Sequence, residues 1–324
     1  MKPVARRSLS KDGMLLVYKP GGMTSKDVSR WIQQRFGKVK MGHVGTLDPL
    51  AEGLLPILFG KATRLQDYLL AGKKSYEFEV GFGRATDTLD ADGSVVAEAP
   101  CDHLERTQLE RICAELVGDF VQVPPMYSAI KFQGKPLYEY ARQGQTERVP
   151  LQLLRRTVRI DSLLCLDYAK GVGRFRMDCS KGTYVRVVAT QIAERAATLG
   201  TVTRLLRLSS GSLRSSDAWT LEQLEAKLDQ FDECIVPIHS IQLDIPRWTC
   251  QLPHLVERLR MGQEMQVEMK MYEGGLAQEG ERRATIRSLD HVVLIDNNGG
   301  SFGIGSATVL NTGRVALRMR RGLS

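Results

Sequence analysis

The sequence predicts an α+β fold over residues 1–245, followed by a compact all-β module over residues 246–324. Three patterns support this prediction: helical periodicity over residues 24–37, strict apolar/polar alternation over residues 75–82, and short alternating segments separated by Asn/Gly turns after Pro237. The chain has 324 residues, of which 43% are hydrophobic and 25% charged. That length and composition suffice for a large globular domain and a small one.

The first helix has the strongest local signals. Thr24-Ser25-Lys26-Asp27 supplies capping residues, an apolar stripe follows at helical spacing, and Gly37 ends the pattern. The strand over residues 75–82 carries Tyr76 near its start, on the apolar face. The same signals predict further elements of this domain, namely helices over residues 107–117, over residues 185–199 and from Thr220, and strands over residues 158–166 and 174–179.

Prolines and glycines interrupt the regular pattern over residues 124–136, and a long basic loop region is predicted there. In the C-terminal module, Met265, Val267, Met269 and Met271 alternate with polar residues. Methionines at a period of two are typical of the buried face of a strand, and this interpretation is favoured over a metal site. Further strands are predicted near Thr285, Val292 and Val315.

The formal net charge of +8 favours a polyanionic partner, because each phosphate neutralised by a lysine or arginine releases condensed counterions. The basic residues are clustered. Residues 201–216 contain three arginines and no acid, residues 142–159 contain five arginines and one glutamate, and residues 19–40 contain Asp27 as their only acid. Such clusters in separate segments indicate a nucleic-acid-binding track, although for any one cluster a solvated surface is an equal alternative.

Targeting and membrane signals are not evident in the sequence. The longest apolar stretch, around residues 54–59, is far shorter than a membrane span, and the N-terminus lacks a hydrophobic signal core. The six cysteines form no Cys-x-x-Cys pair, and none has a histidine at metal-ligand spacing. We therefore expect a soluble cytoplasmic protein with reduced thiols and no membrane association.

Motifs for nucleotide and metal cofactors fail at specific positions. A phosphate-binding loop at Gly60-Lys61 would need a glycine where Leu55 stands, and no Ser or Thr follows the lysine. Asp90-Ala91-Asp92-Gly93 imitates part of a calcium loop, but Thr88 and Ala99 occupy its first and last ligand positions. A turn between strands is the better interpretation. The five histidines are scattered, so we predict no metal and no cofactor.

Asp48 lies in the segment His43-Val44-Gly45-Thr46-Leu47-Asp48-Pro49-Leu50-Ala51-Glu52-Gly53. The glycines make this segment a loop, and Pro49 drives Asp48 into an extended conformation that presents its carboxylate. An ionised aspartate before a mainly apolar stretch needs a partner or a substrate to offset its desolvation. On local chemistry alone, an ordinary Asp-Pro turn is favoured over a functional site.

Three further segments change this interpretation. They are Lys19-Pro20-Gly21-Gly22-Met23-Thr24-Ser25, Pro124-Pro125-Met126-Tyr127-Ser128-Ala129-Ile130-Lys131, and Ser180-Lys181-Gly182-Thr183-Tyr184-Val185-Arg186. Together with the Asp48 segment, their order and spacing resemble the tRNA pseudouridine synthase B (TruB) family. The segment Gly83-x-x-Thr86-Asp87-Thr88-x-Asp90-x-x-Gly93 is also similar to that family, and the C-terminal module is similar to its PUA domain. The resemblance extends from Met14 to about Arg320.

The resemblance implies an α+β catalytic domain with a mixed antiparallel sheet and flanking helices, a thumb-like insertion at about residues 125–155, and a small β-barrel-like PUA module. It also implies an enzyme that isomerises uridine-55 to pseudouridine in the T loop of tRNA, without metal or cofactor. The N1–C1′ glycosidic bond breaks, the base turns, and it rejoins the ribose through C5. We expect the protein to act as a monomer on the T stem-loop.

The resemblance also implies the roles of three catalytic residues. Asp48 matches the family's nucleophilic aspartate, with attack at C1′, attack at C6 and assistance to glycal formation all left open. Arg186 matches the arginine that holds it, and a cation within about 4 to 6 Å is expected to lower the Asp48 pKa by roughly 1 to 3 units. Tyr76 matches the aromatic on which the flipped base stacks, and it is a candidate to accept or relay the C5 proton. Stacking worth about 1 to 3 kcal/mol would offset much of the cost of flipping.

Five further residues are carried over from the resemblance as the substrate- or RNA-binding set. His43 is expected against the T loop, Tyr184 and Leu205 as walls of the pocket, Lys19 as a supporting residue that shapes the site, and Lys131 as an RNA contact of the thumb. The thumb is expected to become ordered on RNA.

The chain departs from the family pattern at one position. Where the family has Leu-Arg-Arg, this chain has Leu205-Leu206-Arg207, and the preceding Arg204 is a candidate substitute. The difference puts one phosphate contact in doubt and leaves the chemistry unchanged.

Two other classes of function are alternatives. The basic clusters and the PUA-like module fit an RNA-binding or tRNA-folding chaperone, a role that is compatible with catalysis. A glycosidase with paired carboxylates, Asp48 and Glu52, has no separate support for a sugar substrate.

Overall fold

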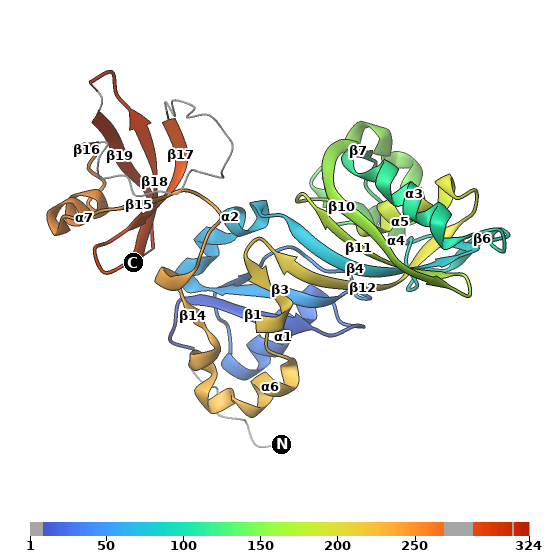
Figure 1. The fold of residues 1–324 in the computed structure, drawn as a ribbon. Coiled ribbons are helices and arrows are strands. Elements are labelled where there is room, and N and C mark those ends of the chain that lie inside the picture. Colours follow the sequence, from blue (N-terminus) through green and yellow to red (C-terminus); the bar gives the residue numbers. More distant parts are fainter. Residues whose placement is uncertain (1–8, 269–287, 313, 324) are drawn as a thin grey trace, which may run out of the picture.

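The computed structural model describes residues 9–268, 288–312 and 314–323 (Figure 1). The strands of its first part are β1 (Gly13–Lys19), β2 (Met41–His43), β3 (Glu52–Phe59), β4 (Lys74–Phe82), β5 (Arg84–Thr86), β6 (Val95–Glu98), β7 (Gly118–Gln122), β8 (Lys131–Phe132), β9 (Lys135–Pro136), β10 (Arg156–Ala169), β11 (Val172–Cys179), β12 (Gly200–Ser210), β13 (Leu213–Arg214) and β14 (Val236–Pro237). Its helices are α1 (Ser25–Phe36), α2 (Gln66–Ala71), α3 (Arg106–Leu116), α4 (Leu137–Arg142), α5 (Val185–Arg195) and α6 (Leu221–Ala226). The C-terminal part holds β15 (Arg247–Thr249), α7 (Pro253–Arg260), β16 (Met265–Glu268), β17 (Ser288–Ile295), β18 (Ser301–Val309) and β19 (Arg314–Gly322).

A ten-stranded sheet forms the frame of the larger part. Its order is β14-β1-β3-β12-β4-β11-β10-β7, with β2 paired to β3 and β13 paired to β12. The β3–β12 pair is parallel, and the other pairs of this sheet are antiparallel. The expected mixed sheet with flanking helices is therefore confirmed.

The alternation predicted for residues 75–82 is confirmed in β4, whose apolar side chains are buried on one face while the intervening residues are partly exposed. β1 and β3 differ, because both of their faces are covered. On one face Leu15 and Ile57 join the core that contains Val28 of α1, and on the other Met14 and Leu58 pack in the cluster that contains Leu69 of α2. A strand buried on both faces has a continuous apolar sequence without a period of two. For this reason β1 and β3 were not predicted from the sequence.

A second, five-stranded sheet of order β15-β17-β18-β19-β16 forms the C-terminal part, as expected for the PUA-like module (Figure 1). Met265 and Val267 are buried in β16, whereas Met269, Met271 and Thr285 lie outside the described residues. Helix α7, with its proline in the first turn, was not predicted. The boundary at residue 245 stays a prediction, and the two sheets share a hydrophobic cluster.

The predicted helix ends were only partly correct. Thr24 and Thr220 cap α1 and α6 in complete capping boxes, as predicted. The helix predicted over residues 107–117 starts and ends one residue earlier, as α3 (Arg106–Leu116), and Glu105 before it makes no side-chain cap. Helix α5 ends at Arg195 rather than Leu199, since Ala197 adopts a left-handed conformation with φ 55° that a helix cannot contain.

Residues 124–155 are more regular than the predicted basic loop. Between β7 and β10 the chain forms the β8–β9 hairpin and α4, and Leu137, Tyr140 and Val149 make a small core of their own. The limits of a thumb at about 125–155 stay a prediction. Over the described residues, no helix is both long and apolar enough to cross a membrane.

Candidate active site

The residues predicted to be catalytic line one cleft of about 690 Å³, a volume suited to a small ligand. Asp48 comes from the loop between β2 and β3, Tyr76 from β4 and Arg186 from the first turn of α5. Tyr184 and Leu205, predicted as pocket walls, line the same cleft. The sheet and α5 therefore bring together segments that are far apart in the sequence.

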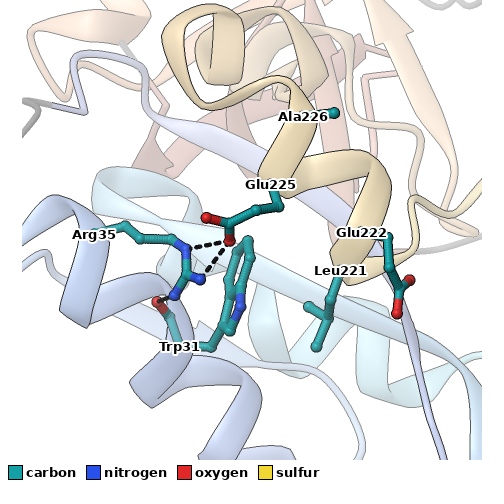
Figure 2. A pocket seen from close by; sticks show the side chains of 6 residues that line it. All are labelled: Trp31, Arg35, Leu221, Glu222, Glu225 and Ala226. Atoms are coloured by element: carbon teal, nitrogen blue, oxygen red, sulfur yellow. Dashed lines mark hydrogen bonds and ion pairs between the residues drawn. The ribbon is translucent and has the colours of Figure 1, made fainter.

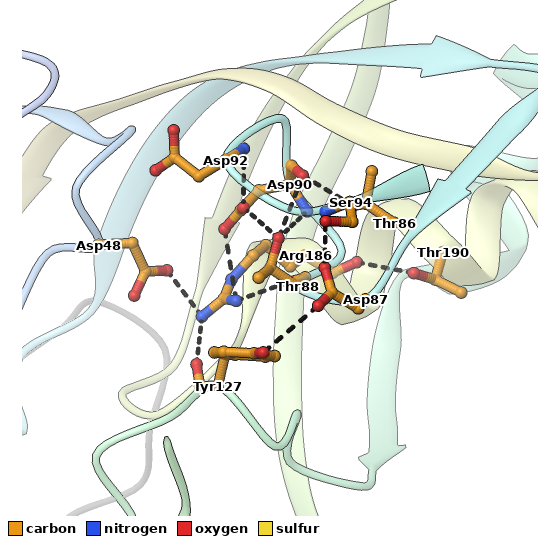
Figure 3. A network of polar contacts seen from close by, with 10 residues as sticks. All are labelled: Asp48, Thr86, Asp87, Thr88, Asp90, Asp92, Ser94, Tyr127, Arg186 and Thr190. Carbon is orange, nitrogen blue, oxygen red and sulfur yellow. Dashed lines mark hydrogen bonds and ion pairs between the residues drawn. The ribbon is translucent and has the colours of Figure 1, made fainter. Parts of the chain in front are cut away.

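Asp48 and Arg186 are in direct contact. Asp48 Oδ2 lies 2.9 Å from Arg186 Nη2, and the Asp48 side chain is 35% exposed whereas that of Arg186 is 3% exposed. Arg186 also donates to the carbonyl oxygens of Thr88 at 2.7 Å and Tyr127 at 2.8 Å. Figure 3 shows the guanidinium between these groups. The two backbone carbonyls thus hold the guanidinium in place, and Asp48 is its partner at the cleft.

Asp90 is a second carboxylate on Arg186, at 3.4 Å from Nη1, and its side chain is 5% exposed. It accepts hydrogen bonds from the Thr88 hydroxyl at 2.6 Å and the Asp92 amide at 3.2 Å (Figure 3). The segment that imitates a calcium loop is therefore a turn between β5 and β6, as predicted. Sequence reasoning missed Asp90 as a partner of Arg186, and the resemblance of its segment was the one signal that pointed to it.

Arg186 lowers the Asp48 pKa, as expected, but the net shift of this pKa is upward. Burial raises the pKa of the Asp48 carboxyl, and nearby Asp90 raises it further, while Arg186 and Lys19 act in the opposite direction. Desolvation outweighs the cation because the loop and the cleft walls remove much of the water around the carboxyl. A poorly hydrated carboxylate that retains a cationic partner is a suitable nucleophile.

Tyr76 lies at the cleft with its ring on the buried face of β4. Burial raises the pKa of its hydroxyl, which interacts with the guanidinium of Arg207. A raised pKa keeps the phenol protonated near neutral pH. Its roles as a stacking platform and as a proton relay stay predictions.

Arg207 does not occupy the position of a phosphate contact. Its side chain is 2% exposed, and its guanidinium donates hydrogen bonds to the carbonyl oxygens of Leu54 and Gly45, each at 2.7 Å. Arg204 is exposed and lies 3.9 Å from Glu79. Leu206, the departure from the family pattern, is partly buried.

Lys19 supports the loop of Asp48 from inside. Its side chain is fully buried, and its ammonium donates to the carbonyl oxygens of Pro20 at 2.9 Å, Met23 at 2.6 Å and Pro49 at 3.1 Å. Burial lowers the pKa of Lys19 to about 8. This placement fits the supporting role expected for the residue.

His43 and Lys131 lie outside the lining of the cleft. The His43 Nε2 atom is 3.0 Å from the Thr46 hydroxyl, and burial lowers the pKa of its imidazole. Lys131 is exposed on the β8–β9 hairpin. Their expected contacts with RNA stay predictions.

A second hollow of about 700 Å³ lies between α1 and α6 (Figure 2). Its arginine, Arg35, stacks 3.9 Å from the centre of the Trp31 ring and binds Glu225. The hollow contains none of the predicted site residues, and its arginine is paired with Glu225. We therefore assign the active site to the cleft of Asp48.

No cysteine is among the residues that line the cleft. All six cysteines are unpaired, and five of them are buried. Within the described ranges, no three His, Cys, Asp or Glu side chains gather closely enough to hold a metal ion. Independence from metals and cofactors stays a prediction.

Comparison with known structures supports the fold. The crystal structure of a Cbf5-Nop10-Gar1 complex includes a chain that matches with a TM-score of 0.71 and 20% identity, over 97% of this chain and 85% of that one. The archaeal box H/ACA sRNP Nop10-Cbf5 complex matches with a TM-score of 0.67 and 18% identity, over 100% and 94% of the two chains.

Sequence relatives are more similar. The model of the TruB family pseudouridylate synthase N-terminal domain matches residues 33–185. The tRNA pseudouridine synthase B of Geobacillus thermodenitrificans is 42% identical over 246 residues, which cover 73% of this chain and 80% of that protein. The protein of the same name from Psychrobacter arcticus is 40% identical over 262 residues, covering 79% and 67%. With this identity over most of its length, the chain belongs to the TruB family of pseudouridine synthases.

Proposed function

We propose that this protein isomerises uridine to pseudouridine in tRNA, specifically at uridine-55 of the T loop, with Asp48 as the nucleophile. The contact between Asp48 and Arg186 in a cleft bordered by Tyr76 is the observation that carries the proposal. The curated relatives named tRNA pseudouridine synthase B support tRNA as the substrate. We further propose that the protein acts in the cytoplasm, as a monomer on the T stem-loop.

The reaction exchanges one bond of the base for another. The N1–C1′ bond breaks, a C5–C1′ bond forms, the C5 proton leaves, and N1 gains a proton. No electrons are gained or lost, so the balance requires neither an oxidant nor a reductant. Arg186 opposes the effect of burial on Asp48 and so favours the carboxylate that attacks.

The target base must leave the stack of the T loop to reach Asp48. Flipping costs a few kcal/mol, and stacking on an aromatic ring returns about 1 to 3 kcal/mol. Tyr76 supplies such a ring, with Tyr184 and Leu205 as the neighbouring walls. Arg156 and Lys181 also line the cleft and provide positive charge for the RNA backbone.

The paired-carboxylate alternative has no support in the cleft. The partner of Asp48 is the cation Arg186, whereas the Glu52 carboxylate accepts a hydrogen bond from the Tyr18 hydroxyl at 3.2 Å. Inverting and retaining glycosidases instead place two carboxyl groups on opposite sides of the scissile bond.

Release of tritium from T-arm RNA that carries 5-tritiated uridine only at position 55 tests the proposal. Wild-type protein should release the label, because C5 loses its hydrogen when it bonds to C1′. Asp48→Asn should abolish release while RNA binding is retained, since the amide cannot attack. The absence of release by wild type would refute the assignment.

Asp92→Asn is the matched control for this variant. Asp92 lies in the same network, but its carboxylate is exposed and only its backbone amide contacts Asp90 (Figure 3). The control should keep its activity. If the Asp92 and Asp48 variants lost activity equally, the nucleophile assignment would fail.

A further inference from the structure

Arg207 is a buried cation in the wall of the active-site cleft. A charged side chain is costly to enclose unless it is paired, yet among the described residues no carboxylate lies within ion-pair distance of Arg207. Its Nε donates to the Leu54 carbonyl at 2.7 Å, and its Nη2 donates to the carbonyls of Gly45 at 2.7 Å and Val44 at 3.4 Å. The charge is therefore held by backbone dipoles.

The groups that Arg207 contacts belong to the parts that carry the site. Gly45 begins the turn that leads to Asp48, and Leu54 lies on β3 just after that loop. Tyr76 is the cross-strand partner of Arg207 in the β12–β4 pair, and its hydroxyl interacts with the guanidinium. A single planar group thus joins the loop of the nucleophile, β3 and the aromatic platform.

The loop follows the shape of the guanidinium closely. Gly45 has φ +73°, and a Cβ atom there would lie 2.9 Å from Arg207 Nη1. A glycine is needed at this point both for the backbone conformation and for the close approach. Lysine cannot replace the arginine, because its single ammonium has no planar fork that reaches two carbonyls in fixed directions.

We propose that Arg207 is a positioning residue that fixes the Asp48 loop relative to Tyr76 and does not contact RNA. This inference rests on the proposed function and adds to it the role of the arginine that follows Leu206, the position at which the chain departs from the family pattern. Misplacement of a reacting group by about 1 Å can cost on the order of 100-fold in rate, although binding is unaffected.

Arg207→Gln tests the inference under single-turnover conditions with the 5-tritiated T-arm RNA. The rate at saturating protein should fall about 100-fold, while the RNA dissociation constant and its salt dependence stay at wild-type values. Arg207→Lys keeps the charge but lacks the fork, so it should also be slow. Arg176→Gln is the matched control, because Arg176 is exposed on β11 of the same sheet, and it should retain the wild-type rate.

The outcomes separate positioning from the alternatives. Weaker RNA binding in Arg207→Gln, with the salt slope reduced by about 0.7 to 0.9 and an unchanged rate at saturation, would show a phosphate contact and overturn the proposal. A reduced product amplitude at the wild-type rate would mean a smaller folded fraction and would also overturn it. A wild-type rate in Arg207→Lys would overturn the requirement for the fork. No release by wild type would instead count against the proposed function.

Discussion

Replacement of Arg186 by methionine should lower the free energy of unfolding by about 3 to 5 kcal/mol, the usual cost of removing one partner from a buried ion pair. The Asp90 side chain is 5% exposed, so the variant leaves its carboxylate inside the protein without a cation. The carbonyls of Thr88 and Tyr127 lose donors as well. At roughly 2 to 4 °C per kcal/mol, the melting temperature should fall by roughly 6 to 20 °C.

Denaturant unfolding of wild type and variant at neutral pH measures this loss. The matched control is Arg84→Met, since Arg84 is exposed and lies 3.8 Å from Glu98, and the loss should stay below about 1 kcal/mol. Addition of Asp90→Asn to Arg186→Met should restore part of the stability, because it removes the stranded charge. A loss of less than about 1 kcal/mol in Arg186→Met would refute the reasoning.

Two further predictions concern pH. Burial raises the pKa of Asp48, so the folded state binds its proton more tightly, and the contribution of this group to stability is lost as pH rises through the raised value. Asp48→Asn should therefore become increasingly stable relative to wild type as pH rises from the ordinary pKa of 3.8 to the raised one, and a constant difference in melting temperature would contradict this. The Lys19 pKa is lowered from 10.5 to about 8, so the folded state releases its proton first and wild type should gain stability relative to Lys19→Met as pH rises between these values. Unfolding curves of both proteins on either side of pH 8 check the sign.

Elements with local signals were predictable from the sequence. The capping box of α1 joins Thr24 to Asp27, three residues away, and the alternation of β4 arises because one face alone is covered. The resemblance predicted that Asp48, Tyr76 and Arg186 lie together, and the cleft contains all three.

The remaining features depend on contacts between distant segments. The sequence of β12 predicted a basic cluster but no strand. Arg207 is charged and yet buried, so the order of polar and apolar residues does not show which side chains of this strand face the core. Asp90 reaches Arg186 only through the fold of the β5–β6 turn against β12. The direction of the Asp48 pKa shift depends on how much water the cleft walls exclude from the carboxyl. The local sequence does not show this.

Lys19 and Arg207 are both held by carbonyl groups of the backbone. Every residue type supplies the same carbonyl, so the side chains that surround these two cations can diverge during evolution without loss of the bonds. The cations themselves have no such freedom, because only a long cationic side chain supplies both the charge and the reach. The geometry of the active site therefore depends on very few side chains, and otherwise on the conformation of the backbone.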